Sequence, residues 1–157
     1  MIARDKAPIK HHRWDIEGIY LAASEFRSAI EKCSFYLGGS FATFPTGCCG
    51  DTSLILGTHL AEQELGEFQY MLGDYRSEKD GSWSSHAWLQ CDCLIVDITA
   101  DQFPEISDTV IVRENSEWHA TLNGEPQNLA DYRIYDTATA ATLSRLHAHV
   151  VDTIFGI

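Results

Sequence analysis

The sequence has no apolar run long enough to cross a membrane and no recognisable secretion signal. A membrane-spanning helix needs about 20 consecutive apolar residues, and every apolar run here is shorter. The segment Met1–His12 is polar and partly basic, whereas a secretion signal has an apolar centre. We therefore expect a cytoplasmic protein; delivery as a secreted effector, by a machinery that needs no cleavable signal, is also compatible with the sequence.

Basic residues are scarce. The chain has 11 Lys and Arg against 23 Asp and Glu, so its formal net charge is −12. This charge repels a phosphate backbone and an anionic lipid surface, and we predict neither a nucleic-acid partner nor a membrane partner. With 157 residues, of which 45% are hydrophobic, the chain can bury one substantial core. We expect a single domain, residues 1–157; the oligomeric state cannot be read from the sequence.

The cysteines do not fit a disulfide framework or a structural zinc site. There are five of them, so at least one thiol has no partner within the chain. Cys91 and Cys93 have one residue between them, and Cys48 and Cys49 are adjacent. Structural zinc sites use two pairs of ligands, each with two to four residues between its members. The pairs His11-His12 and His147-x-His149 lack a matching set of ligands and are expected at the surface or on a helix. We predict no metal and no organic cofactor.

The hydrophobic spacing predicts an α+β domain. Apolar residues three and four apart indicate helices with a buried face, whereas short β-branched and aromatic runs indicate strands. The predicted order is a helix over 15–33, a glycine-rich loop over 34–47, a central helix over 49–65 packed on more than one side, strands near 68–73, 86–90, 93–99 and 108–113, weaker strands at 117–121 and 131–135, and a helix over 138–155.

A cysteine stands where the loop becomes the central helix. The run Gly47-Cys48-Cys49-Gly50 leads directly into the apolar residues of that helix. The positive end of a helix dipole lowers the pKa of a thiol and favours the thiolate, which is its nucleophilic form. We therefore take Cys49, at the first helical turn, as a candidate nucleophile.

His86 and Asp97 come next along the chain and supply a base and a group to orient it. A hairpin with a two-residue turn at Cys91-Asp92 would pair His86 directly with Asp97, with Cβ atoms about 4.5–5.5 Å apart on one face of the sheet. A three-residue loop would send Asp97 to the opposite face. The alternative is a core hairpin in which His86 only makes a structural hydrogen bond and Asp97 starts a turn.

These motifs resemble the transglutaminase-like branch of the papain-like cysteine enzymes. The resemblance covers Gly47-x-Cys49, His86-Ala87-Trp88 and Asp97-Ile98-Thr99, in the order and at the spacing of that family. It implies a papain-like α+β fold in which a central helix bearing the nucleophile packs on an antiparallel sheet. It also implies Cys49 as nucleophile, His86 as base and Asp97 as orienter, with Cys48 in the free position.

The sequence departs from the papain pattern at the oxyanion site. Papain-like proteases carry a glutamine six or seven residues before the nucleophile, where this chain has Thr43 and Ala42. Gln102, shortly after the aspartate, is a candidate second donor beside the backbone N–H of Cys49. Two tryptophans complete the candidate substrate-side residues: Trp83, expected in a loop lining the cleft, and Trp88, expected to shield the ion pair from water.

The resemblance implies a cysteine-dependent amide hydrolase acting on a protein or peptide. A specific protease and a glutamine deamidase fit the triad equally. Transfer of the acyl group to an amine, as in a transglutaminase, would use the same residues. A catalytically idle binding module that keeps the fold for recognition is the alternative from another class.

Overall fold

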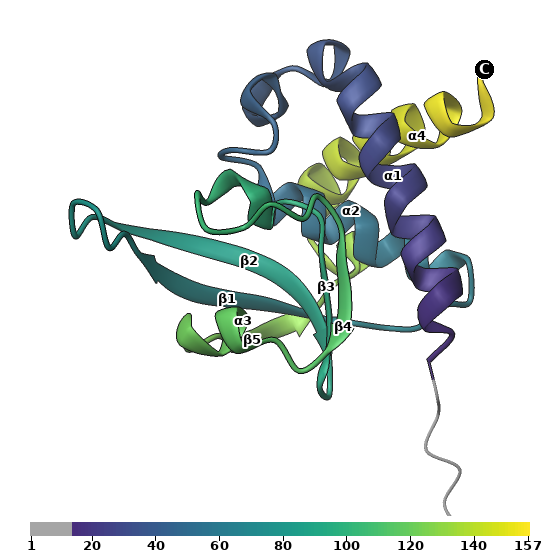
Figure 1. Cartoon of the computed structure of the whole chain (residues 1–157). Helices are drawn as coiled ribbons and strands as arrows, with labels where there is room; N and C mark the ends of the chain where they lie inside the picture. Colours follow the sequence, from purple (N-terminus) through teal and green to yellow (C-terminus); the bar gives the residue numbers. More distant parts are fainter. Residues whose placement is uncertain (1–13) are drawn as a thin grey trace, which may run out of the picture.

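The computed structural model describes residues 14–157; the segment Met1–His12, with His11 and His12, lies outside the described residues. The elements, in chain order, are α1 (Ile16–Leu37), the short 3-10 helix η1 (Gly39–Thr43), α2 (Cys49–Glu62), β1 (Gln69–Arg76), β2 (Trp83–Cys91), β3 (Leu94–Asp97), η2 (Ala100–Gln102), β4 (Ile111–Glu114), α3 (Glu117–Thr121), β5 (Glu125–Leu129), η3 (Tyr132–Ile134) and α4 (Thr137–Phe155). Helices segregate from an antiparallel sheet, which confirms the α+β class (Figure 1). Among the described helices, none combines the length and apolarity of a membrane span.

The five strands form one antiparallel sheet in the order β4-β3-β2-β1-β5. The three long helices, α1, α2 and α4, gather on one side of it (Figure 1). Helix α2 packs on β2 and also contacts α1 and α4. Every residue from Thr52 to Leu60 is buried, which confirms the prediction of a central helix. Its approach to the segment after β5 is so close that a Cβ at Gly57 would collide with the backbone of Ala130.

Side chains alternate between two cores across the sheet. Leu89 of β2 and Val96 of β3 face the long helices and belong to the larger core. Their neighbours Trp88 and Ile95 face the opposite way and join a smaller core with residues of η2 and α3, including Phe103, just past η2. The candidate catalytic residues lie where β2 and β3 border this smaller core.

Helices α1 and α4 begin at residues that favour a helix N-terminus, and α4 ends at a glycine. Asp15 caps α1 by accepting from the backbone N–H of Gly18 at 2.9 Å, and Asp136 caps α4 in the same way. Gly156 ends α4 in the left-handed conformation that glycine adopts readily. Helix α2 differs, because the side chain of its N-cap residue, Cys48, makes no capping hydrogen bond.

Two weaker strand predictions are wrong. Residues 117–121 form helix α3, because the Ser116 side chain caps it by accepting from the backbone N–H of His119. Residues 131–135 hold the short 3-10 helix η3, capped by Asp131. The fifth strand is β5, which the sequence did not reveal because Pro126 interrupts it; proline is tolerated there because β5 is an edge strand.

Candidate active site

Cys49 is the first residue of α2 and is partly exposed. The turn into the helix uses Gly47 at φ 80°, a left-handed conformation suited to glycine. Burial would raise the pKa of the Cys49 thiol, but a hydrogen bond and the positive charge of His86, with the backbone N–H of Ala87, lower the pKa below its ordinary value. Cys48 points into the core, and burial raises its pKa to about 11. The thiolate is therefore favoured at Cys49 and disfavoured at Cys48.

His86 lies on β2 and is fully buried. Its Nε2 atom is 2.7 Å from Oδ2 of Asp97, which leaves Nδ1 as the nitrogen available to the Cys49 thiol. Burial alone would lower the pKa of His86, but the Asp97 carboxylate and the Cys49 thiolate raise it to about 9. Both shifts favour the pair of charges, an imidazolium beside a thiolate, more than in the free side chains.

The hairpin register differs from the prediction by two residues. Cys91 pairs with Leu94, and Leu89 pairs with Val96, so the turn residues are Asp92 and Cys93. Asp92 takes the left-handed conformation at φ 50°, which aspartate tolerates better than most residues. A shift of two residues preserves the face of each side chain, so Asp97 reaches His86 diagonally across the sheet.

Four hydrogen-bond donors surround the Asp97 carboxylate. Oδ1 accepts from the backbone N–H of Thr99 at 2.9 Å and lies 3.4 Å from the Thr99 hydroxyl. Oδ2 accepts from His86 and from Nε2 of His119, 2.8 Å away. Burial would raise the pKa of Asp97, but the charge of His86 and the histidine hydrogen bonds hold it well below the usual range. The carboxylate therefore stays ionised although it is buried.

His119 is a site residue that the sequence did not reveal. It lies on α3, is 2% exposed, and its Nδ1 atom is 2.6 Å from the Ser116 hydroxyl. Its ring packs edge-on against the rings of Trp88 and Trp118. Ser116 is the sequence signal that could have revealed His119. A helix that begins after Ser116 places His119 three residues further on, next to the Ser116 side chain.

Aromatic rings enclose the His86 ring. Ring centroids of Trp88, Phe103 and Trp118 lie 5.9, 5.0 and 5.7 Å from it. Trp88 is 2% exposed, which fits the shielding role and not contact with substrate. Exclusion of water by these rings strengthens the attraction within the His86–Asp97 pair.

Gln102 reaches the same site from η2. Its side-chain nitrogen donates to the carbonyl of Thr99 at 3.0 Å and lies 3.4 Å from Nδ1 of His86. The amide is therefore next to the nitrogen that serves Cys49. This places Gln102 within reach of a group bound to the thiol.

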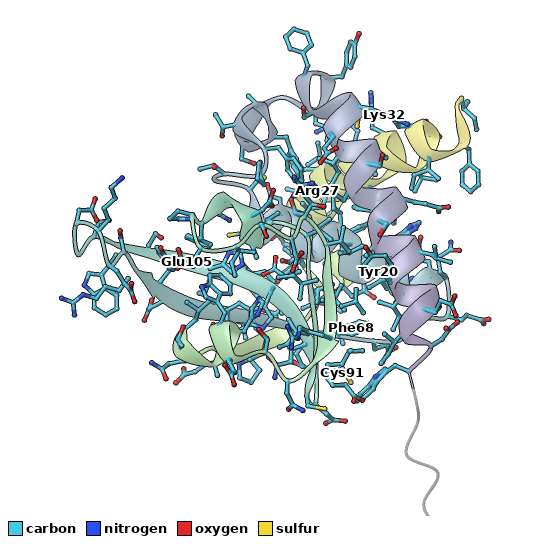
Figure 2. All side chains as sticks on the ribbon, viewed as in Figure 1. Tyr20, Arg27, Lys32, Phe68, Cys91 and Glu105 are labelled. Carbon is cyan, nitrogen blue, oxygen red and sulfur yellow. The ribbon has the colours of Figure 1, made fainter. Side chains whose placement is uncertain are left out.

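Arg27 of α1 is a second residue that the sequence did not reveal (Figure 2). Its guanidinium donates to the carbonyl of Ile98 at 2.7 Å and to both carboxylate oxygens of Asp101, at 2.6 and 2.9 Å. The same guanidinium bonds Glu31 one turn along α1. Arg27 thus fixes the segment that follows Asp97. It also fixes η2, whose residue Gln102 lies next to His86.

Tyr70 of β1 lies against the start of α2. A Cβ at Gly50 would come within 3.0 Å of the Tyr70 hydroxyl. Burial first, and then the nearby Cys49 thiolate, raise the pKa of Tyr70 to about 12. The group is therefore a neutral O–H donor beside the nucleophile's helix start, where α2 has no side-chain cap.

An open groove of about 1110 Å³ adjoins the site. Trp83, Tyr75, Glu105 and Trp118 are among its lining residues. Trp118 also packs against His86, but Cys49, His86 and Gln102 are not among the residues that line the groove. Trp83 is 66% exposed, but it begins strand β2 and does not lie in a loop as predicted.

The described residues contain two groups that offer three metal-ligand atoms within 4.8 Å of one another: His86, Asp97 and His119, and separately His59, Glu62 and His147. In the first group the two histidines hydrogen-bond one carboxylate oxygen directly, at 2.7 and 2.8 Å. A cation there would have to displace both of these protons. The second group lies outside the candidate active site.

Comparisons of the chain with protein-family models, with curated proteins and with solved structures give no match.

Proposed function

We propose that this protein is a cysteine-dependent amide hydrolase of the papain-like, transglutaminase-like type, with narrow specificity for a protein or peptide substrate. The observation that carries the proposal is the contact of the Cys49 thiol, at a helix N-terminus, with a buried His86–Asp97 pair. The pKa of the thiol is lowered and that of the imidazole raised, as nucleophilic catalysis near neutral pH requires.

In the proposed reaction the Cys49 sulfur attacks the carbonyl carbon of an amide. The His86 imidazolium gives its Nδ1 proton to the leaving nitrogen, the C–N bond breaks, and a thioester remains. Water then attacks the thioester while His86 accepts one of its protons. The acid product leaves and the Cys49 thiolate is restored.

The negative oxygen of the tetrahedral intermediate needs hydrogen-bond donors. The first backbone N–H groups of α2 are suitable, since no side chain caps this helix. We propose that Gln102 or Tyr70 supplies a further donor, because the amide lies 3.4 Å from the His86 nitrogen and the hydroxyl lies against Gly50. Removal of one such donor typically costs about 10²–10³ in kcat.

A neutral or basic substrate surface suits this protein. Its formal net charge is −12. The groove beside Trp118 is lined by three carboxylates, Asp74, Glu78 and Glu105, and by two basic residues, Arg76 and Lys79, so the long-range attraction comes from the whole protein more than from the groove. Acidic partners are repelled at long range, and basic ones are attracted. We propose that Trp83 packs against the bound chain from the exposed wall of this groove.

The proposal is tested by comparing the protein with its Cys49→Ala variant in a cell extract. The extract proteins are mapped by mass spectrometry for glutamine converted to glutamate, for new chain ends and for new amine adducts. A change at few sites that depends on Cys49 is expected, and its type distinguishes deamidation, proteolysis and acyl transfer. If no change depends on Cys49, and Cys49 alkylates like a free thiol, the protein is a binding module and the proposal fails.

A further inference from the structure

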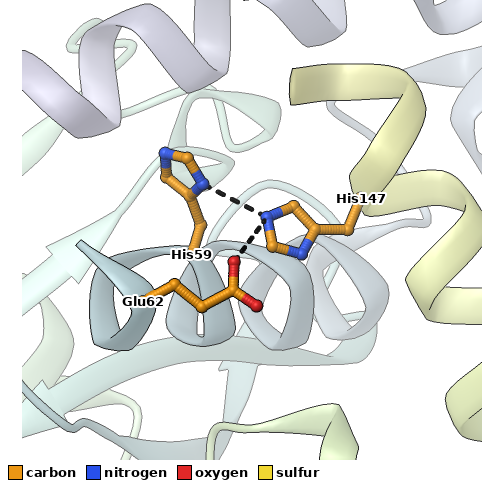
Figure 3. A group of neighbouring side chains, drawn as sticks. All are labelled: His59, Glu62 and His147. Atoms are coloured by element: carbon orange, nitrogen blue, oxygen red, sulfur yellow. Dashed lines mark hydrogen bonds and ion pairs between the residues drawn. The ribbon is translucent and has the colours of Figure 1, made fainter. Parts of the chain in front are cut away.

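A second cluster of chemically active side chains lies at the opposite end of α2 from Cys49. His59 and Glu62 project from the last turn of α2 toward His147 of α4 (Figure 3). At 1.5 Å per residue, ten residues of helix separate His59 from Cys49 by about 15 Å. The cluster is therefore independent of the candidate active site.

The three ligand atoms already have nearly the spacing of a metal site. Nδ1 of His59 is 3.1 Å from Nε2 of His147, and that Nε2 is 3.9 Å from Oε2 of Glu62. In a tetrahedral zinc site, bonds of about 2.0–2.2 Å place ligand atoms roughly 3.3–3.6 Å apart. The separation between His147 and Glu62 is too long for a hydrogen bond but is close to this ligand spacing.

The surroundings of His147 orient the ring for metal binding. Its other nitrogen, Nδ1, is 2.8 Å from the hydroxyl of Tyr132. The tautomer that donates from Nδ1 to this oxygen leaves the Nε2 lone pair directed toward His59, where it accepts the Nδ1 proton of that ring. A cation would displace this one proton, and His59 would then carry its proton on Nε2. A ligand histidine is typically held in this way by a hydrogen bond from its second nitrogen.

Both imidazoles are buried and held in place by packing. His59 and His147 are 7% and 4% exposed, and the ring of Phe26 packs against both. His147 was expected to have no partner set; it is buried with one, whereas His149, two residues along α4, is exposed.

We propose that His59, Glu62 and His147 bind a divalent transition-metal ion, with Zn²⁺ the best fit and water as the fourth ligand. Two imidazoles and one carboxylate form a ligand set that zinc accepts, and its tetrahedral preference matches the spacing. The Glu62 side chain is 43% exposed, so an ion can enter from solvent. The bound ion would cross-link α2, which carries Cys49, to α4.

The test is a Zn²⁺ titration of the chelator-treated protein, followed by calorimetry and thermal denaturation. Cys49→Ala, Cys91→Ser and Cys93→Ser are combined in the background, so that the partly exposed thiols do not bind zinc. Glu62→Gln and His147→Gln each remove one ligand. Glu64→Gln and His149→Gln are the matched controls, since both make the same chemical change at exposed positions nearby.

The expected result is one Zn²⁺ per chain and a zinc-dependent rise in Tm. Glu62→Gln and His147→Gln should weaken zinc binding by more than about 10-fold, since even loss of a residue that only supports a ligand costs that much. Both controls should bind as the background does. The proposal is overturned if the background binds no zinc, or if Glu62→Gln binds it equally well. Because Glu62 is exposed, Glu62→Gln should fold, so it tests the site even if His147→Gln fails to fold.

Discussion

Replacement of His86 by glutamine tests the thiolate–imidazolium pair directly. Glutamine is similar to histidine in size and can still donate a hydrogen bond to Asp97, but it carries no positive charge. The hydrogen bond and charge of His86 are what lower the pKa of Cys49 against the effect of burial. In His86→Gln, burial acts without them, and we expect the pKa of Cys49 to exceed the ordinary value of 9.0.

The size of the effect follows from the thiolate fraction. A thiol with a pKa of 9.0 is about 0.1% thiolate at pH 6. Thiols paired with an imidazolium are in general largely ionised at this pH, and the pKa of Cys49 is shifted in that direction. The gain in nucleophilicity that accompanies a higher thiol pKa recovers part of this loss. We therefore expect alkylation of Cys49 by iodoacetamide at pH 6 to slow by about 10²-fold, which corresponds to about 2.7 kcal/mol.

The assay follows alkylation of each cysteine by mass spectrometry between pH 5 and pH 10. Cys48 is an internal control, because burial raises its pKa to about 11 and it should stay unreactive at pH 6 in both proteins. His149→Gln, an exposed histidine on α4, controls for the substitution itself. Equal reactivity of Cys49 at pH 6 in a His86→Gln protein that remains folded would refute the pairing.

Three further predictions concern the surroundings of the pair. His119→Phe should lower stability by about 1.5–3 kcal/mol, measured by thermal denaturation, because Asp97 loses one buried hydrogen bond; Cys49 alkylation at pH 6 should change only a few-fold. Arg27→Met should cost about 3 kcal/mol in urea denaturation, and adding Asp101→Leu should recover part of this, because the first change leaves a largely buried carboxylate unpaired. The pKa of His86 is raised above its unfolded value, so the stabilisation by the charged ring is full below about pH 6.5 and is lost as the pH rises through about 9. A pH–rate profile should show amide hydrolysis falling over the same upper range, because the imidazolium that acts as general acid loses its proton.

The sequence predicted the elements whose formation depends on residues close together in the chain. Helices α1 and α4 have a 3-4 spacing of apolar residues and begin at capping aspartates, so their existence follows from neighbouring positions in the chain. The face shared by His86 and Asp97 was also predictable, since it depends only on the parity of the hairpin loop. The register was not, because it depends on which residue takes the left-handed conformation, and Asp92 does so as the first turn residue, not the second.

Contacts between distant parts of the chain left no such pattern. Arg27 binds Asp101 across 74 positions, and no periodicity marks either residue. His119 was hidden by a local error, since the short run around it was interpreted as a strand when Ser116 makes it a helix. Both residues act on Asp97 or on the segment after it, so the residues that hold the aspartate in place were the ones that only the fold reveals.

The complete set of donors around Asp97 constrains the direction of proton movement in the proposed reaction. Oδ1 accepts a hydrogen bond from Thr99, and Oδ2 accepts from His86 and His119, so both carboxylate oxygens have donors. The pKa of Asp97 lies well below the usual range. Such an anion holds the Nε2 proton of His86 by a hydrogen bond without taking it. Any proton that His86 gives up must then leave from Nδ1, the nitrogen that faces Cys49 and Gln102. In the proposed reaction, Asp97 is therefore a fixed charge that would direct proton transfer by His86 toward the thiol and the leaving group.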